Sequence, residues 1–312
     1  MQTLLHHISL AAPLFILVLI GYALVRWGRW PKSIADALTR FVFSLALPAL
    51  LFSMMSDFSN LPPVDARLLI AFFGSCLIVF AVGRALARYA LHLDGVSGSI
   101  FALGGVFSNN VLLGLPLARV TLGEDAVPSV ALVLVFNSLI LWTLVTVSVE
   151  WARHGSLSVH GFAKTAFSVI TNPIVAAIVS GTLYGLTGLP LPTIIAAPLT
   201  MIASAAAPMA LLALGMGLAT YPVRQDWHLS VSICAIKLVL QPMVVWLLAR
   251  ALGLPKVETQ VVVLLASIAV GANVYLMARQ FKALEGPIAA SLVMSTALAA
   301  ITTPVVLTLT GL

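Results

Sequence analysis

Charged residues are scarce along this chain. Only 8% of its 312 residues are Asp, Glu, Lys or Arg, whereas 61% are hydrophobic, and a soluble domain usually carries about a quarter charged residues. A surface that faces water cannot be built from so few charges. The composition therefore excludes a soluble globular protein and indicates a chain that lies mostly in lipid.

Carboxylates are missing from the middle of every long apolar run. Asp36 begins one run, and the other acids lie at run ends or in loops: Asp57, Asp65, Asp94, Glu124, Asp125, Glu150, Asp226, Glu258 and Glu285. Pumps and antiporters that relay protons through the membrane use buried acids. Their absence here disfavours that mechanism.

The positions of histidine and cysteine do not indicate a reactive or metal-binding site. All six histidines lie at run ends or in loops: His6, His7, His92, His154, His160 and His228. Cys76 and Cys234 fall inside apolar runs, where cysteine acts as a small apolar residue. With no HExxH motif and no paired intramembrane aspartates, we expect neither an enzyme nor a metal site, a disulfide or a cofactor.

Long apolar runs are what the sequence does contain. A helix needs roughly 20 apolar residues to cross about 30 Å of hydrocarbon, and ten such runs predict an all-α membrane protein with spans at 9–26, 33–55, 66–91, 98–122, 125–150, 162–186, 194–220, 228–253, 258–281 and 285–310. A β-barrel would need alternating segments of about ten residues instead.

The basic residues predict how the chain is oriented. Eleven Lys and Arg residues follow the odd-numbered spans, whereas only four (Arg67, Arg119, Arg250 and Lys256) follow the even-numbered ones. Because cytoplasmic loops carry the excess of positive charge, both termini are expected outside the cytoplasm. The basic residues are spread over short loops, so the net charge of +6 does not indicate nucleic-acid binding.

Matched residues recur at one sequence offset. A shift of 160 residues aligns Pro13 with Pro173, Gly21 with Gly181, Gly28 with Gly188 and Pro48 with Pro208. This predicts two five-helix repeats, 1–152 and 153–312. Because five is odd, the second copy enters the membrane from the opposite side, and inverted repeats commonly enclose a substrate site at the midplane, formed by discontinuous helices.

The fourth span contains three consecutive polar side chains near its middle. The stretch from Ser108 to Pro116 reads SNNVLLGLP, and Gly114 and Pro116 are expected to bend or break the helix there. The ninth span has a matching weakness at Gly271, followed by Asn273, which aligns with Asn110 at an offset of 163. A proline kink or an amide hydrogen bond between helices is the simpler alternative for each.

Half-helix N-termini and asparagine amides together suit an anion. Two N-termini aimed at one point supply positive partial charge and free N–H groups, so a carboxylate is the expected ligand of Asn109, Asn110 and Asn273. Asn137, mid-span in helix five, either lines the same cavity or bonds a neighbouring helix. Lys237, the one charge placed deep in a span, attracts the anion, pairs with carbonyls freed by a proline, or reaches an interface.

These residues resemble the auxin efflux carrier family over essentially the whole chain. The resemblance rests on the Ser108–Pro116 stretch, on Lys237 to Pro242 and on Asn273 to Phe281, and is closest to bacterial members described as malonate or other dicarboxylate carriers. It implies two inverted repeats, a scaffold and a transport domain, and helices four and nine crossing at the substrate site.

By the same resemblance, Asn109, Asn110, Asn137 and Asn273 contact the substrate, and the protein resides in the bacterial inner membrane. The partners expected are a small organic carboxylate and the lipid bilayer, with no nucleic acid, and a homodimer is compatible with it. Family members usually carry a proline at the helix-nine crossover where this chain offers Gly271, which predicts a softer second break.

Three other functions stay open from the sequence. A sodium-coupled carrier of the bile-acid type has a similar fold with crossing helices, and its ion could bind backbone carbonyls and the amides of Asn109, Asn110 or Gln241. A membrane receptor is a remote alternative, because it would not explain paired breaks in mirrored helices. An intramembrane enzyme is equally remote, because it would need a nucleophile with its base, or a metal cluster, inside the spans.

Overall fold

The computed structural model describes residues 2–56, 64–154, 173–220 and 227–309. Within these ranges every regular element is a helix, as the sequence predicted. The linker and first part of the predicted sixth span, residues 155–172, lie outside the described residues. The elements are α1 (Gln2–Arg26), α2 (Lys32–Phe41), η1 (Val42–Ala46), α3 (Leu47–Met55), α4 (Arg67–Tyr89), α5 (Gly95–Gly104), η3 (Asn110–Gly114), α6 (Leu115–Leu122), η4 (Glu124–Ala126), α7 (Val127–His154), α9 (Pro173–Gly185), α10 (Thr193–Leu218), α11 (Trp227–Ala235), η5 (Ile236–Leu240), α12 (Gln241–Ala251), α13 (Lys256–Ser267), α14 (Ala272–Phe281) and α15 (Glu285–Leu309).

Six helical segments in the described ranges are long and apolar enough to cross a membrane. They are Ser9–Arg26, Lys32–Met55, Arg67–Tyr89, Thr193–Leu218, Trp227–Ala251 and Glu285–Leu309. The predicted fourth and ninth spans are each divided into two shorter helical segments. These divisions create the candidate site.

Three helices pass over a proline by widening one turn into a π-helix. In each case the residue before the proline donates its N–H to the carbonyl five residues earlier, from Leu47 to Val42, from Leu115 to Asn110 and from Gln241 to Ile236. Proline cannot donate and clashes with the carbonyl four residues back, and a π-bulge relieves this without ending the helix. The sequence predicted a bend or break across Ser108 to Pro116, and the helix continues through Pro116 with a widened turn.

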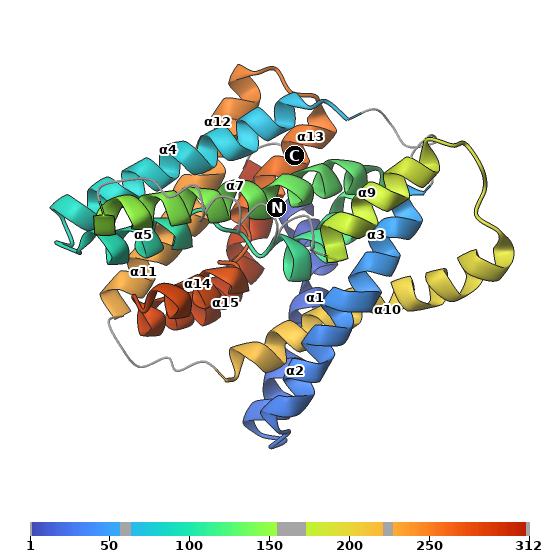
Figure 1. Cartoon of the computed structure of the whole chain (residues 1–312), viewed down its shortest axis with the longest axis horizontal. Coiled ribbons are helices and arrows are strands. Elements are labelled where there is room, and N and C mark those ends of the chain that lie inside the picture. Colours follow the sequence, from blue (N-terminus) through green and yellow to red (C-terminus); the bar gives the residue numbers. More distant parts are fainter. Residues whose placement is uncertain (1, 57–63, 155–172, 221–226, 310–312) are drawn as a thin grey trace.

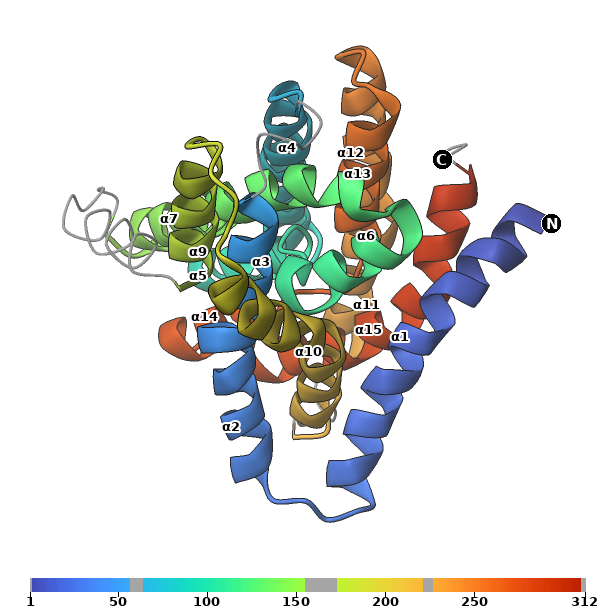
Figure 2. The same cartoon turned by 90° about the vertical axis from the view of Figure 1, so that its right-hand side faces the viewer.

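The described helices form two packed groups (Figures 1 and 2). α1, α2, η1, α3, α9 and α10 pack mainly on one another, while α4 to α7 and α11 to α15 form the second group. Each group takes helices from both halves of the sequence. A division at residue 152 therefore does not coincide with the boundary between these two packed groups.

Glycines allow the closest helix contact in the first group, between α1 and α10. A Cβ atom on Gly215 would lie 1.9 Å from the Val18 carbonyl oxygen, and one on Gly21 would lie 2.2 Å from the Leu212 carbonyl oxygen. Small residues let membrane helices approach until their backbones touch. These two glycines thus set the separation of α1 and α10.

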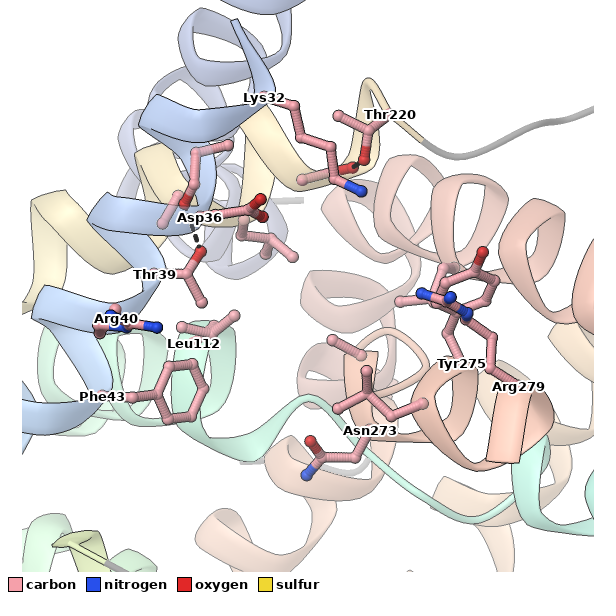
Figure 3. Close-up of a pocket in the computed structure, with 17 residues that line it drawn as sticks. Lys32, Asp36, Thr39, Arg40, Phe43, Leu112, Thr220, Asn273, Tyr275 and Arg279 are labelled. Atoms are coloured by element: carbon pink, nitrogen blue, oxygen red, sulfur yellow. Dashed lines mark hydrogen bonds between the residues drawn. The ribbon is translucent and has the colours of Figure 1, made fainter. Parts of the chain in front are cut away.

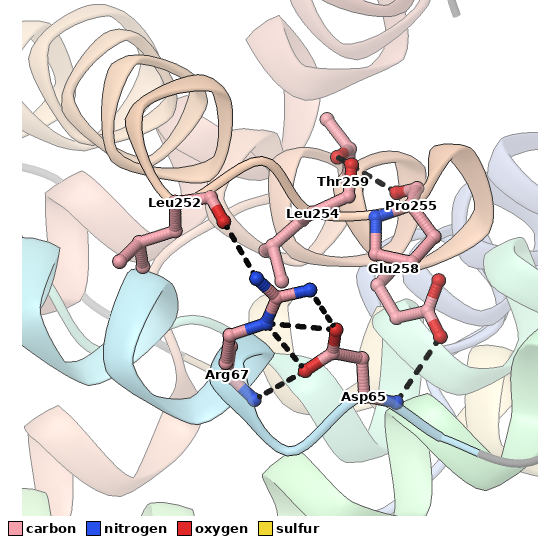
Figure 4. A network of polar contacts seen from close by, with 7 residues as sticks. All are labelled: Asp65, Arg67, Leu252, Leu254, Pro255, Glu258 and Thr259. Atoms are coloured by element: carbon pink, nitrogen blue, oxygen red, sulfur yellow. Dashed lines mark hydrogen bonds and ion pairs between the residues drawn. The ribbon is translucent and has the colours of Figure 1, made fainter.

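A polar network joins the start of α4 to the loop between α12 and α13 (Figure 4). Arg67 pairs with Asp65 at 2.5 Å and donates to the Leu252 carbonyl at 3.1 Å. The Asp65 N–H donates to Glu258 Oε1 at 3.3 Å. The Arg67 side chain is 53% exposed, so solvent screens this ion pair and its main effect is to fix the local geometry.

Asp94 caps the N-terminus of α5, the helix that leads into the first break. Its Oδ1 accepts the N–H groups of Val96 at 2.9 Å and Ser97 at 3.0 Å. Hydrogen bonds from Ser97, from its side chain first and then its backbone, lower the pKa of the Asp94 carboxyl. The ionised form is therefore the one that stabilises the fold.

Replacing Asp94 with alanine is expected to cost about 0.5 to 2 kcal/mol of stability, as for other lost N-caps. Because the folded-state pKa is depressed, this contribution is present above the unfolded pKa of about 3.9 and is lost as pH falls through the folded value. Thermal unfolding of wild type and Asp94→Ala in detergent should therefore differ at neutral pH and converge in acid. A difference that persists in acid would exclude the ionised cap as its cause.

Candidate functional site

The two interrupted helices cross at their breaks. α5 ends at Gly104 and α13 at Ser267, and the non-helical residues that follow pair as one antiparallel bridge between Ser108 and Val270. The Asn109 N–H donates to the Ala269 carbonyl at 3.0 Å, and the Gly271 N–H donates to the Phe107 carbonyl at 2.8 Å. At each break, backbone groups that lack a partner within their own helix thus form hydrogen bonds with the other break.

The predicted break residues occupy different places around this crossing. Gly271 is the last residue of the second break, where a Cβ would lie 2.9 Å from the Ser108 carbonyl oxygen. Gly114 ends the π-helix η3, and Pro116 stands in the first turn of α6. The interruption itself lies earlier, at 105–109, because the π-helix absorbs the proline.

Side chains from η5 and α15 satisfy the backbone freed at the end of α13. Ser295 Oγ accepts the Val270 N–H at 3.0 Å, Thr303 Oγ1 donates to the Ser267 carbonyl at 2.9 Å, and Lys237 Nζ donates to the Ala266 carbonyl. Lys237 has an exposed fraction of 0%. Of the sequence alternatives, the structure shows this lysine paired with a freed carbonyl, but the carbonyl belongs to α13 and not to its own helix.

The four predicted asparagines meet at a cavity of about 180 Å³ beside the crossing. Asn109 and Asn110 come from the first break and η3, Asn137 from α7 and Asn273 from α14. Lys237 does not line this cavity. Its full lining is Phe43, Phe107, Ser108, Asn109, Asn110, Val111, Leu112, Leu134, Asn137, Ile174, Val175, Gly271, Ala272 and Asn273.

Several polar atoms of the cavity residues lack a protein partner. Asn110 Nδ2 donates to Asn137 Oδ1 at 3.3 Å, yet Asn110 Oδ1, Asn109 Nδ2 and Ser108 Oγ are buried without a hydrogen bond to any described residue. A buried polar group left unpaired costs about 1 to 3 kcal/mol. Clustering three of them at one cavity is the pattern of a ligand site.

The first turns of two half-helices also line this cavity. Asn110 to Leu112 begin the segment that continues as α6, and Ala272 and Asn273 begin α14. N–H groups in a first turn have no intrahelical acceptor and carry positive partial charge. Since none of the lining side chains is charged, the cavity favours an anion through neutral donors and helix ends alone.

A larger cavity of about 460 Å³ adjoins the inner one. Phe43, Leu112, Ala272 and Asn273 line both cavities. Figure 3 shows Arg40 of α2 and Phe43 of η1 on one wall, and Tyr275 and Arg279 of α14 on the other. We name this larger cavity the vestibule.

Sequence reasoning missed the vestibule and the contribution of Phe43. Arg40 and Arg279 are among the eleven basic residues that predict the orientation, and Phe43 is one apolar residue among many in its span. A helical projection through α2 and η1 would place Asp36, Arg40 and Phe43 on one side. What they face could not have been inferred without the packing of α14.

Comparison with known proteins decides the family. The family described as "Membrane transport protein" matches residues 6–307. The chain belongs to this membrane transport protein family. A relative in Rhizobium meliloti (strain 1021), named "Putative malonate transporter", is 27% identical over 97% of this chain and 94% of its own length.

Plant relatives of this membrane transport protein cover less of the chain. "Probable auxin efflux carrier component 5a" of Oryza sativa subsp. japonica is 30% identical over 46% of this chain and 40% of its own length. "Auxin efflux carrier component 5" of Arabidopsis thaliana is 27% identical over 47% and 42%. The predicted resemblance to the auxin efflux carriers is confirmed, and the family and these names identify a multi-pass membrane transporter and not an enzyme.

Proposed function

We propose that this protein is a secondary transporter that carries small organic carboxylate anions across the bacterial inner membrane by alternating access. The observation that carries the proposal is the cavity at the crossing. Four asparagines and two helix N-termini surround a space without a charged side chain, and two of the unpaired buried atoms there, Asn109 Nδ2 and Ser108 Oγ, can donate hydrogen bonds. That arrangement suits a carboxylate, which accepts several hydrogen bonds at once.

The volume of the inner cavity limits the size of the anion that it can bind. At about 180 Å³ it is smaller than the roughly 300 to 1,000 Å³ of sites for drug-sized ligands. A short carboxylate fits this limit, and the name of the Rhizobium relative supplies malonate as the compound to test first.

The architecture we propose is ten membrane-spanning segments in two inverted repeats, 1–152 and 153–312. The matched prolines and glycines at an offset of 160 support it, together with breaks at 105–109 and 268–271 that fall close to that offset. The cavity is lined by both helix groups, with Phe43, Ile174 and Val175 from the first and the asparagines from the second. Movement of one group past the other would expose the cavity to each side in turn.

Both termini are proposed to lie outside the cytoplasm. Eleven basic residues follow the odd-numbered spans and only four lie on the other side, and cytoplasmic loops carry the excess of positive charge. An impermeant thiol reagent added to intact cells should label Gln2→Cys and spare Arg29→Cys. The two native cysteines, Cys76 and Cys234, are buried and should not react. The reverse labelling would invert the topology.

Ligand binding tests the transport proposal directly. Malonate at 100 times its Kd should stabilise the purified protein by about 2.7 kcal/mol, seen as a raised thermal midpoint, and proteoliposomes should take up labelled malonate in sodium-free buffer. Uptake that requires sodium would favour the bile-acid type of symporter instead. If no mono- or dicarboxylate shifts the midpoint or is taken up, the proposal fails.

A further inference from the structure

Three cations line the vestibule that leads to the inner cavity. Lys32 and Arg40 come from α2 and Arg279 from the last turn of α14, while Asp36 is the acid among the lining residues. None of the three cations pairs with a described acid, since the ion pairs of the described ranges join Arg67 to Asp65 and Arg119 to Glu124. The vestibule therefore has a positive balance of charge, whereas the inner cavity has none.

The three cations lie on both walls of the vestibule, which adjoins the inner cavity. Arg40 belongs to the first helix group and Arg279 to the second, on opposite sides of the space in Figure 3. The vestibule borders the inner cavity directly, because Phe43, Leu112, Ala272 and Asn273 line both. An anion that reaches the inner cavity by this route passes the field of both arginines.

We infer that Lys32, Arg40 and Arg279 form an anion-collecting site in the vestibule, which selects dianions over monoanions before they reach the asparagines. The inference rests on the proposed function and adds a second, electrostatic site to it. Coulomb energy scales with ligand charge, so a cation that strengthens binding of a monoanion threefold strengthens binding of a dianion about ninefold. None of the side chains that line the inner cavity is charged, so the formal charges that discriminate in this way lie in the vestibule.

Binding of malonate and acetate to the purified full-length protein at neutral pH tests the inference. At low ionic strength, about 10 mM, Arg40→Gln and Arg279→Gln should each weaken malonate binding by roughly tenfold and acetate binding by roughly threefold. Both losses should shrink at about 150 mM salt, where the Debye length falls to about 8 Å.

Two further variants sharpen the test. Asp36→Asn removes the opposing charge from the same wall and should tighten malonate binding, most at low salt. Arg26→Gln is the matched control, because Arg26 ends α1 outside the vestibule lining, and it should leave both affinities unchanged.

The outcomes separate this inference from the proposed function. If wild type binds no carboxylate, the proposed function fails before any variant is needed. If wild type binds malonate and Arg40→Gln and Arg279→Gln match Arg26→Gln at low salt, the vestibule inference is overturned and the inner site stands. Equal losses for malonate and acetate that are insensitive to salt would overturn it too, because they indicate direct contact in place of a collecting field.

Discussion

Leucine in place of Asn110 or Asn273 is expected to abolish tight carboxylate binding while leaving the protein folded. Each change removes an amide donor from the cavity lining, and a hydrogen bond to a charged group contributes about 1.5 to 3 kcal/mol. The affinity for malonate should therefore fall by roughly tenfold to over a hundredfold. Titration of the purified variants, followed by intrinsic fluorescence or thermal midpoint, measures it.

Asn110 offers the clearer of the two substitutions. It is 1% exposed and its Oδ1 has no described partner, while its Nδ2 donates one bond, to Asn137 Oδ1. Leucine fills similar space and removes both the unpaired oxygen and this donor. The matched control is Ser180→Leu on α9, whose hydroxyl bonds only carbonyls of its own helix, at Ala176 and Ala177. Asn110→Leu protein that unfolds like wild type and still binds malonate normally would remove the asparagines from the site.

Valine at Gly215 is expected to prevent α1 and α10 from packing. Because even a Cβ would stand 1.9 Å from the Val18 carbonyl oxygen and 2.8 Å from the Tyr22 nitrogen, the two backbones must separate along their contact. Overpacking costs typically about 1 to 3 kcal/mol and occasionally more, and here the obstacle is backbone that cannot rotate away. We expect a loss above about 3 kcal/mol, seen as a collapsed yield of monodisperse protein.

Gly217 supplies the control on the same helix, two residues along. A Cβ there would meet nothing within 4 Å. Alanine should therefore be neutral or should stabilise by up to about 1 kcal/mol through helix propensity. Equal thermal midpoints for Gly215→Ala and Gly217→Ala would show that α1 can move aside without cost.

The sequence predicted the helical class and the residues around the cavity more fully than it predicted their geometry. Apolar runs of roughly 20 residues predict membrane-spanning helices, and an asparagine in the middle of such a run is conspicuous among leucine and valine residues. The position of the first break could not be predicted, because Pro116 is the visible helix breaker and the π-helix that accommodates it depends on local bonding at Asn110 and Leu115. The sequence also could not show which carbonyl Lys237 meets, since Ala266 lies on another helix.

The bridge between the two breaks has a mechanical consequence. The bonds from Asn109 to Ala269 and from Gly271 to Phe107 lie among buried side chains, where water cannot replace them and each unpaired group is costly. These two hydrogen bonds thus hold the starts of η3 and α14 together as one unit. In the proposed alternating access, this unit would move as a whole, so a bound ligand would keep its contacts with both helix N-termini while the opposing wall of η1 and α9 moves relative to it.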